Sequence, residues 1–193
     1  MIQAPISDPS SKEDLLRDFA AIRPWSEAFW LGIASGEFFA PIGDAWSPAD
    51  NVRHLLKSNR PLEKALGLPK LMLLARFWVS RGRSRNYSEL VGTYQDALGG
   101  GLTAGRFTPR PLAAGEDTPE MQRRLVTDLS ATLDGIAAAT QRWSERQLDW
   151  LRLPHPGLGP LTVREMLMFT LYHQTHHAGT VARRMGLSPG VSD

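Results

Sequence analysis

Apolar residues recur along most of the chain at steps of three and four, which is the period of an amphipathic helix. Almost nothing alternates between apolar and polar at period two, so we expect no β-sheet. Four long helices joined by turns predict an all-α fold, a four-helix bundle. The four stretches with a helical pattern are about 11–34, 47–66, 119–142 and 162–185.

Capping residues mark the boundaries of two of these helices. Ser47 directly precedes Pro48, the order of residues that is favoured at a helix start. Thr162 and Glu165 have the spacing of a capping box, in which each side chain accepts a hydrogen bond from the other residue's backbone. Gly186 then predicts the end of the last helix.

Interior prolines and short patterns add detail to this scheme. Pro24 should kink or split the first helix, and Pro61 weakens a continuous second one, because proline cannot donate the helical hydrogen bond. Residues 70–80 predict an extra short helix, and Ser88 could cap another that runs to Leu98.

The middle of the chain contains a long loop. Residues 99–119 are rich in glycine and proline, and a loop of this length in a compact domain is usually mobile or functional. We find no repeat and no interdomain linker. The 193 residues therefore predict a single domain over 1–193, with a helical core over about 11–186 between an irregular lead and a tail.

Composition restricts the chemistry more than the fold. The chain has no cysteine, which excludes disulfides, thiolate metal sites and a cysteine nucleophile. A formal net charge of +2 is too small to imply a polyanionic partner by itself. The first residues lack the basic and apolar segments of a secretory signal, and the most apolar run, 66–79, is too short to span a bilayer. We therefore expect a soluble, cytoplasmic protein with no membrane partner.

Three of the five histidines lie within five residues, in the segment "HQTHH". His173 and His177 are one helical turn apart and share a face with Met166 and Val181, so they should face the bundle interior. An unpaired polar group costs about 1–3 kcal/mol to bury, and one metal ion would satisfy both imidazoles. His176 points about 100° away and is expected at the surface or beside the ligands, although the spacing of His173 and His176 would also allow ligation.

A further ligand must come from another helix, and only two histidines remain. His54 lies two turns after Ser47 in the second helix and could point into the same core. His155 lies in a loop rich in proline and glycine, a poorer position for a rigid ligand. The residues predict a metal site with an open fourth position for water, formed by His54, His173 and His177. The same spacing also fits polar residues on a helix surface.

The segments "WSPADNVRHLL" and "LTVREMLMFTLYHQTHHAGTVARRMG" together resemble the DinB/YfiT-like superfamily of metal-dependent proteins. The resemblance implies a four-helix bundle with one histidine on the second helix and an HxxxH pair on the last long helix. His54, His173 and His177 stand at the matching positions and would be the ligands. The resemblance covers about 11–186, although 67–118 is longer and richer in glycine and arginine than in the simplest members.

The resemblance also implies an activity. Members include transferases that use bacillithiol, mycothiol or glutathione, and an isomerase of the maleylpyruvate type. Three neutral imidazoles leave the charge of a divalent ion uncompensated, and such an ion lowers the pKa of a bound water or thiol. We therefore expect a metal-dependent transferase that uses a low-molecular-weight thiol, or a hydrolase, with zinc or nickel and a small-molecule substrate. Dimers are common among relatives, so a homodimer is expected.

No further catalytic residue can be named from the sequence. Glu165 and Asp50 are explained by their places at helix starts. Arg53, next to His54, could bind a substrate carboxylate, although exposure to solvent explains it better. A different function would be a protein in which the metal is only a structural staple, such as a non-catalytic binding or stress-response protein.

Nucleic-acid binding is a third reading, which we disfavour. Four arginines between residues 76 and 85 alternate with aromatic residues and could contact phosphates and bases. A basic turn that faces solvent, after a helix whose aromatic residues are in the core, explains them better. The arginines are Arg76, Arg81, Arg83 and Arg85, and the aromatic residues are Phe77, Trp78 and Tyr87.

Overall fold

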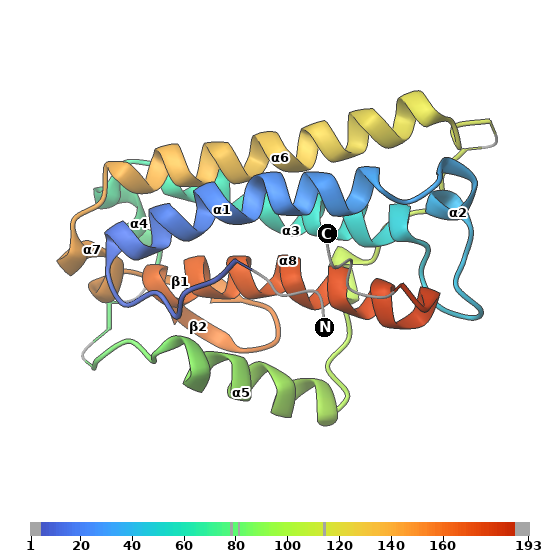
Figure 1. Cartoon of the computed structure of the whole chain (residues 1–193). Coiled ribbons are helices and arrows are strands. Elements are labelled where there is room, and N and C mark those ends of the chain that lie inside the picture. The colour runs from blue at the N-terminus through green and yellow to red at the C-terminus, as the bar shows by residue number, and fades with distance from the viewer. Residues whose placement is uncertain (1–4, 78, 81, 114, 188–193) are drawn as a thin grey trace.

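The chain folds into a bundle of four long helices (Figure 1). The computed structural model describes residues 5–77, 79–80, 82–113 and 115–187. The prediction of an all-α fold is confirmed. The long helices are α1 (Lys12–Leu31), α3 (Pro48–Gly67), α6 (Pro119–Gln141) and α8 (Val163–Met185).

Each long helix packs against two others. α6 contacts both α1 and α3, and α8 contacts the same two helices from the opposite side. The start of α6 meets the end of α1, where the Gln122 side chain donates a hydrogen bond to the carbonyl of Trp30 at 3.0 Å. α1 and α3 are therefore diagonal neighbours, and α3 and α8 lie side by side. This arrangement lets side chains from α3 and α8 meet inside the bundle.

The caps predicted from the sequence are present. The Ser47 hydroxyl accepts a hydrogen bond from the Asp50 amide at 3.0 Å, and Pro48 is the first residue of α3. Thr162 and Glu165 form the predicted capping box at the start of α8. Gly186 ends α8 with φ 65°, a left-handed conformation that glycine adopts without strain. These caps fix the residues at which α3 and α8 begin. The start of each helix helps to determine which of its faces packs against the other.

Neither interior proline splits its helix. α1 continues through Pro24, and α3 continues through Pro61. Both prolines are exposed, and so are Ala20 and Lys57, the residues four positions earlier. The carbonyls that proline leaves without a helical partner therefore face solvent, where water can bind them.

Shorter elements connect the long helices. They are α2 (Ser35–Phe39), α4 (Lys70–Arg76), α5 (Tyr87–Gly99), the 3₁₀ turn η1 (Gly105–Phe107) and α7 (Glu145–Trp150). The expected cap of α5 was wrong. Asn86 caps this helix by accepting from the Glu89 amide at 2.8 Å, and Ser88 lies inside the first turn.

A small β-hairpin, which the sequence pattern did not predict, precedes α8. β1 (Arg152–His155) and β2 (Gly159–Thr162) pair antiparallel, with Leu153 opposite Leu161. These two leucines are buried in the core, and the exposed prolines beside them face outward. Each strand has only four residues, too few for an alternating pattern to be recognised.

Buried apolar side chains fill the bundle along its length. The largest include Trp30, Phe19 and Phe38 toward the N-terminal helices, and Trp143 at the end of α6. No helix in the described part of the chain has both the length and the apolar character needed to cross a membrane.

Candidate metal centre

The structure brings the three predicted ligands together. His54 comes from α3, and His173 and His177 come from α8. The Nε2 atom of His173 lies 3.2 Å from Nε2 of His54 and 3.0 Å from Nε2 of His177. His54 and His173 are buried, and His177 is partly buried. Three imidazole nitrogens thus converge on one point between α3 and α8.

Hydrogen bonds on the far side of two rings set their tautomers. The Nδ1–H of His54 donates to the carbonyl of Phe107 at 3.1 Å. The Nδ1–H of His177 donates to Oδ1 of Asn51 at 2.7 Å. Asn51 is held in this orientation because its Nδ2 donates to the Ser47 carbonyl at 2.8 Å, which leaves Oδ1 as the acceptor. In a neutral ring with a proton on Nδ1, Nε2 carries a lone pair and no proton.

This donor set fits a cation. The lone pairs of His54 and His177 both face Nε2 of His173, which can supply at most one proton. At least one of these short nitrogen–nitrogen contacts therefore lacks a well-aligned hydrogen bond, and without a proton on Nε2 of His173 both do. A tetrahedral zinc ion with Zn–N bonds of about 2.0–2.1 Å places its ligand nitrogens about 3.3 Å apart, close to the spacing here. The cluster could hold a divalent metal ion.

Burial keeps these imidazoles neutral. Loss of solvent lowers the pKa of His173 and of His177 well below the usual value, and each is lowered further by neighbouring histidines. Burial also lowers the pKa of His54, against an opposing effect of the Phe107 carbonyl. The lone pairs are thus available near neutral pH, as metal ligation requires.

A cavity of about 540 Å³ opens beside the cluster. All three histidines line it. The rest of its wall comes from α3, α5, the η1 turn with the residues just before it, the hairpin and α8, and its side chains are mainly apolar and aromatic. Examples are Phe77, Tyr94, Leu98, Leu102, Met166 and Phe169.

The other two histidines lie near the cluster but outside it. His176 packs against Tyr94 and Tyr172, with ring centroids 5.6 and 5.7 Å away. His155 lies on β1, with its ring 4.5 Å from that of Phe169. Both line the cavity, and the group of three that could hold a metal includes neither.

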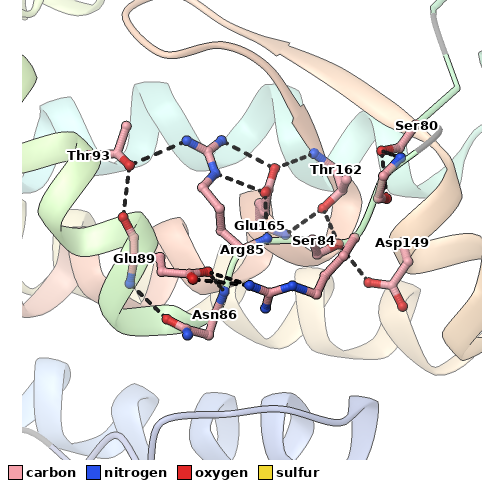
Figure 2. A network of polar contacts seen from close by, with 11 residues as sticks. Ser80, Ser84, Arg85, Asn86, Glu89, Thr93, Asp149, Thr162 and Glu165 are labelled. Atoms are coloured by element: carbon pink, nitrogen blue, oxygen red, sulfur yellow. Dashed lines mark hydrogen bonds and ion pairs between the residues drawn. The ribbon is translucent and has the colours of Figure 1, made fainter.

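Glu165 has the structural role expected from the sequence. Besides completing the cap of α8, its carboxylate accepts from the backbone amide and Nε of Arg85 at 2.9 and 3.0 Å, as Figure 2 shows. Asp50 contacts the Ser47 hydroxyl and pairs with Arg53 at 3.3 Å. These groups stabilise helix starts.

The arginine-rich segment is largely neutralised by acidic partners where the structure describes it. Arg83 pairs with Glu89 at 3.1 Å, and Arg85 pairs with Glu165 (Figure 2). Arg81 and Trp78, two further residues of the predicted interface, lie outside the described residues. The pairing leaves Arg83 and Arg85 less suited to bind phosphates.

Two partners of the ligands were missed by the sequence reasoning. Asn51 had a recognisable signal, because it lies one helical turn before His54 on the face that enters the core. The Phe107 carbonyl had none. A backbone oxygen in a long loop can be placed against a helix only by the tertiary fold.

Comparison with protein families identifies the family of the chain. The sequence model of the DinB superfamily matches residues 26–181, which include α3, α8 and the histidine cluster. The chain therefore belongs to the DinB superfamily. Comparison with curated proteins and with solved structures finds no match.

Proposed function

We propose that the protein binds a divalent metal ion, zinc or nickel, through His54, His173 and His177, and that it is a metal-dependent enzyme. The observation that carries the proposal is the fixed protonation of two ligands. Phe107 and Asn51 hold the Nδ1 protons of His54 and His177, so that both Nε2 lone pairs point at the third imidazole. Such partners orient metal-bound histidines in known metal sites.

The cavity favours an enzyme over a structural staple. Structural zinc sites are closed by four protein ligands, whereas catalytic sites keep one position open. Here three ligands border a space of about 540 Å³, large enough for a small molecule.

We propose a transferase that uses a low-molecular-weight thiol, or a hydrolase that uses water. An ion held by three neutral imidazoles keeps its full charge and lowers the pKa of a bound thiol or water. The chain's own residues supply neutral ligands and a largely apolar space from which bulk water is partly excluded. We further propose that the protein works in the cytoplasm as a homodimer.

The first experiment measures metal content. The tag-free protein is reconstituted with zinc or nickel, dialysed and analysed for bound metal. We expect about one ion per chain, and strong loss of metal in His54→Ala and His177→Ala. His176→Ala is the matched control, since this neighbouring histidine lies outside the cluster and should leave the metal content unchanged. A parent protein without metal after reconstitution would refute the proposal.

A second experiment separates the enzyme from the staple. Cobalt(II) replaces the native ion, and its visible absorption is followed while bacillithiol, mycothiol or glutathione is added. A thiol that enters an open position should change the spectrum. An unchanged spectrum with every thiol and with azide would favour a closed, structural site.

A further inference from the structure

The cavity beside the histidine cluster has almost no charge on its walls. Among the described residues that line it, Arg106 is the only charged side chain, because the histidines are neutral. Arg106 is exposed, and its guanidinium lies 5.1 Å from the centre of the Phe107 ring. A ligand with several negative charges would lose its hydration here without gaining matching cations.

Three polar side chains in the wall donate to partners within the protein. Ser58 donates to the His54 carbonyl at 2.9 Å, and Thr170 donates to the Met166 carbonyl at 2.9 Å. Asn59 donates to Thr132 at 3.1 Å. These groups serve the helices, so they are poorly available to a ligand.

His155 differs from these polar groups. The hairpin turn fixes its ring through one nitrogen and leaves the other nitrogen to bind a ligand. Its Nδ1 accepts hydrogen bonds from the backbone amides of Gly157 at 3.2 Å and Leu158 at 3.0 Å. A nitrogen that accepts carries no proton, so the proton of the neutral ring is on Nε2. Burial lowers the pKa of His155 to about 4, so the ring stays neutral at ordinary pH. Nε2–H makes no hydrogen bond to the described residues.

The same donor lies close to the cluster. The Phe169 ring separates the two sites, with its centroid 4.5 Å from that of His155 and 4.9 Å from that of His173. Both sites line the same cavity, so a molecule long enough to pass the Phe169 ring can contact both His155 and the cluster.

We propose that the cavity binds an uncharged, largely apolar molecule with a carbonyl oxygen, such as a ketone or an ester, and that Nε2–H of His155 binds this oxygen. His155 is then a specificity-determining residue. In an apolar space one donor contributes selectivity, because an analogue without the oxygen leaves that donor unpaired. The claim that this molecule is the substrate of an enzyme rests on the proposed function. The claim that the cavity binds it does not.

The test compares two probes of similar shape, benzophenone and diphenylmethane, which differ by a carbonyl in place of a methylene. Binding is measured by displacement of a neutral fluorescent dye, with metal-free and zinc-loaded protein. We expect benzophenone to bind about 2- to 10-fold more tightly, as one hydrogen bond would give. 4-Benzoylbenzoate, which adds a carboxylate, should bind more weakly than benzophenone. Equal affinity for the first two probes overturns the proposal.

Three variants separate recognition from a structural role in the turn. His155→Phe lacks both the donor and the acceptor and should lose the preference for benzophenone. His155→Gln places an amide donor near the position of Nε2 and should retain it. His155→Asn keeps an acceptor for the turn amides but withdraws the distal donor, and should lose it. The reverse result for Gln and Asn would mean that His155 only supports the turn and would overturn the proposal. Thermal melts verify that each variant is folded.

This test and the metal analysis can fail separately. A preference for benzophenone in a protein that binds no metal supports the role of His155 and refutes the metal site. A metal-loaded protein with no preference refutes the role of His155 and leaves the metal site standing.

Discussion

Asn51 connects the start of α3 to the imidazole of His177. Its Nδ2 donates to the Ser47 carbonyl, and its Oδ1 accepts from Nδ1 of His177. The side chain thus uses the first turn of a helix as a fixed support for a ligand on another helix. Partners of this kind affect both the orientation and the basicity of a metal-bound histidine.

Replacement of Asn51 by alanine should weaken metal binding without removing a ligand. We expect a loss of about 10- to 100-fold in zinc affinity, measured by competition with a chelator dye. Asn59→Ala is the matched control, because Asn59 is a buried asparagine of the same helix that bonds Thr132 instead. It should lower stability and leave zinc affinity nearly unchanged. Equal effects of the two substitutions would argue against the role of Asn51.

At this scale the grouping of the three histidines was predictable from the sequence, and their surroundings were not. His173 and His177 are one turn apart on a helix whose apolar residues show which face is inward, so local periodicity is enough to pair them. The sequence placed His155 in a loop and made it a poorer ligand position than His54, but its use of Nδ1 within a turn depends on a hairpin that was not predicted. A contact between a side chain and a backbone group that is distant in the sequence produces no periodic pattern from which it could be predicted.

At the scale of elements, the loop between α5 and α6 takes part in the site. The carbonyl of Phe107 accepts from His54, and the carbonyl of Thr108 accepts from Lys57 at 3.0 Å. These two hydrogen bonds therefore hold the loop against α3 beside the histidine cluster. If the loop positions a ligand, the bound ion must in turn stabilise the loop by the same free energy.

Limited proteolysis with trypsin should detect this coupling. Within residues 100–118, Arg106 is the one basic residue not followed by proline, and it is exposed. We expect zinc to slow cleavage after Arg106 several-fold, as followed by mass spectrometry of the fragments. Cleavage after Arg83, an exposed residue on another loop, is the internal control and should not change. A similar rate after Arg106 with and without zinc would contradict the coupling.

The long helices were easier to predict than the parts between them. α3 and α8 combine a strong apolar stripe with a cap at the start, so local signals agree. The hairpin over 152–162 has few inward residues, and its prolines tolerate the strands because they lie outside the core. Of the kink or split predicted at Pro24, the split does not occur, because tertiary packing stabilises the whole of α1.

At the scale of the whole molecule, the histidines make stability depend on pH. Burial lowers the pKa of all five below the usual value. The unfolded chain takes up protons near pH 6.5, whereas the folded chain does not. The unfolded state therefore binds more protons as the pH falls, and the free energy of unfolding decreases.

Urea unfolding of the metal-free protein at pH 7.5 and 5.5 tests this dependence. Stability should be full above about pH 6.5 and fall below it, by about 1 kcal/mol at pH 5.5 for each histidine that stays neutral. The double variant His54→Gln, His177→Gln should show a smaller fall. An increase in stability on acidification would contradict the pKa shifts.

The position of the cluster in the chain also has a consequence for biosynthesis. His54 and His173 are 119 residues apart, and they meet because α8, the last helix, packs beside α3. While the ribosome is still adding α8, the emerging polypeptide has one ligand and no partner for it. An ion held by all three histidines is thus acquired only after α8 has been synthesised, later than the other three long helices.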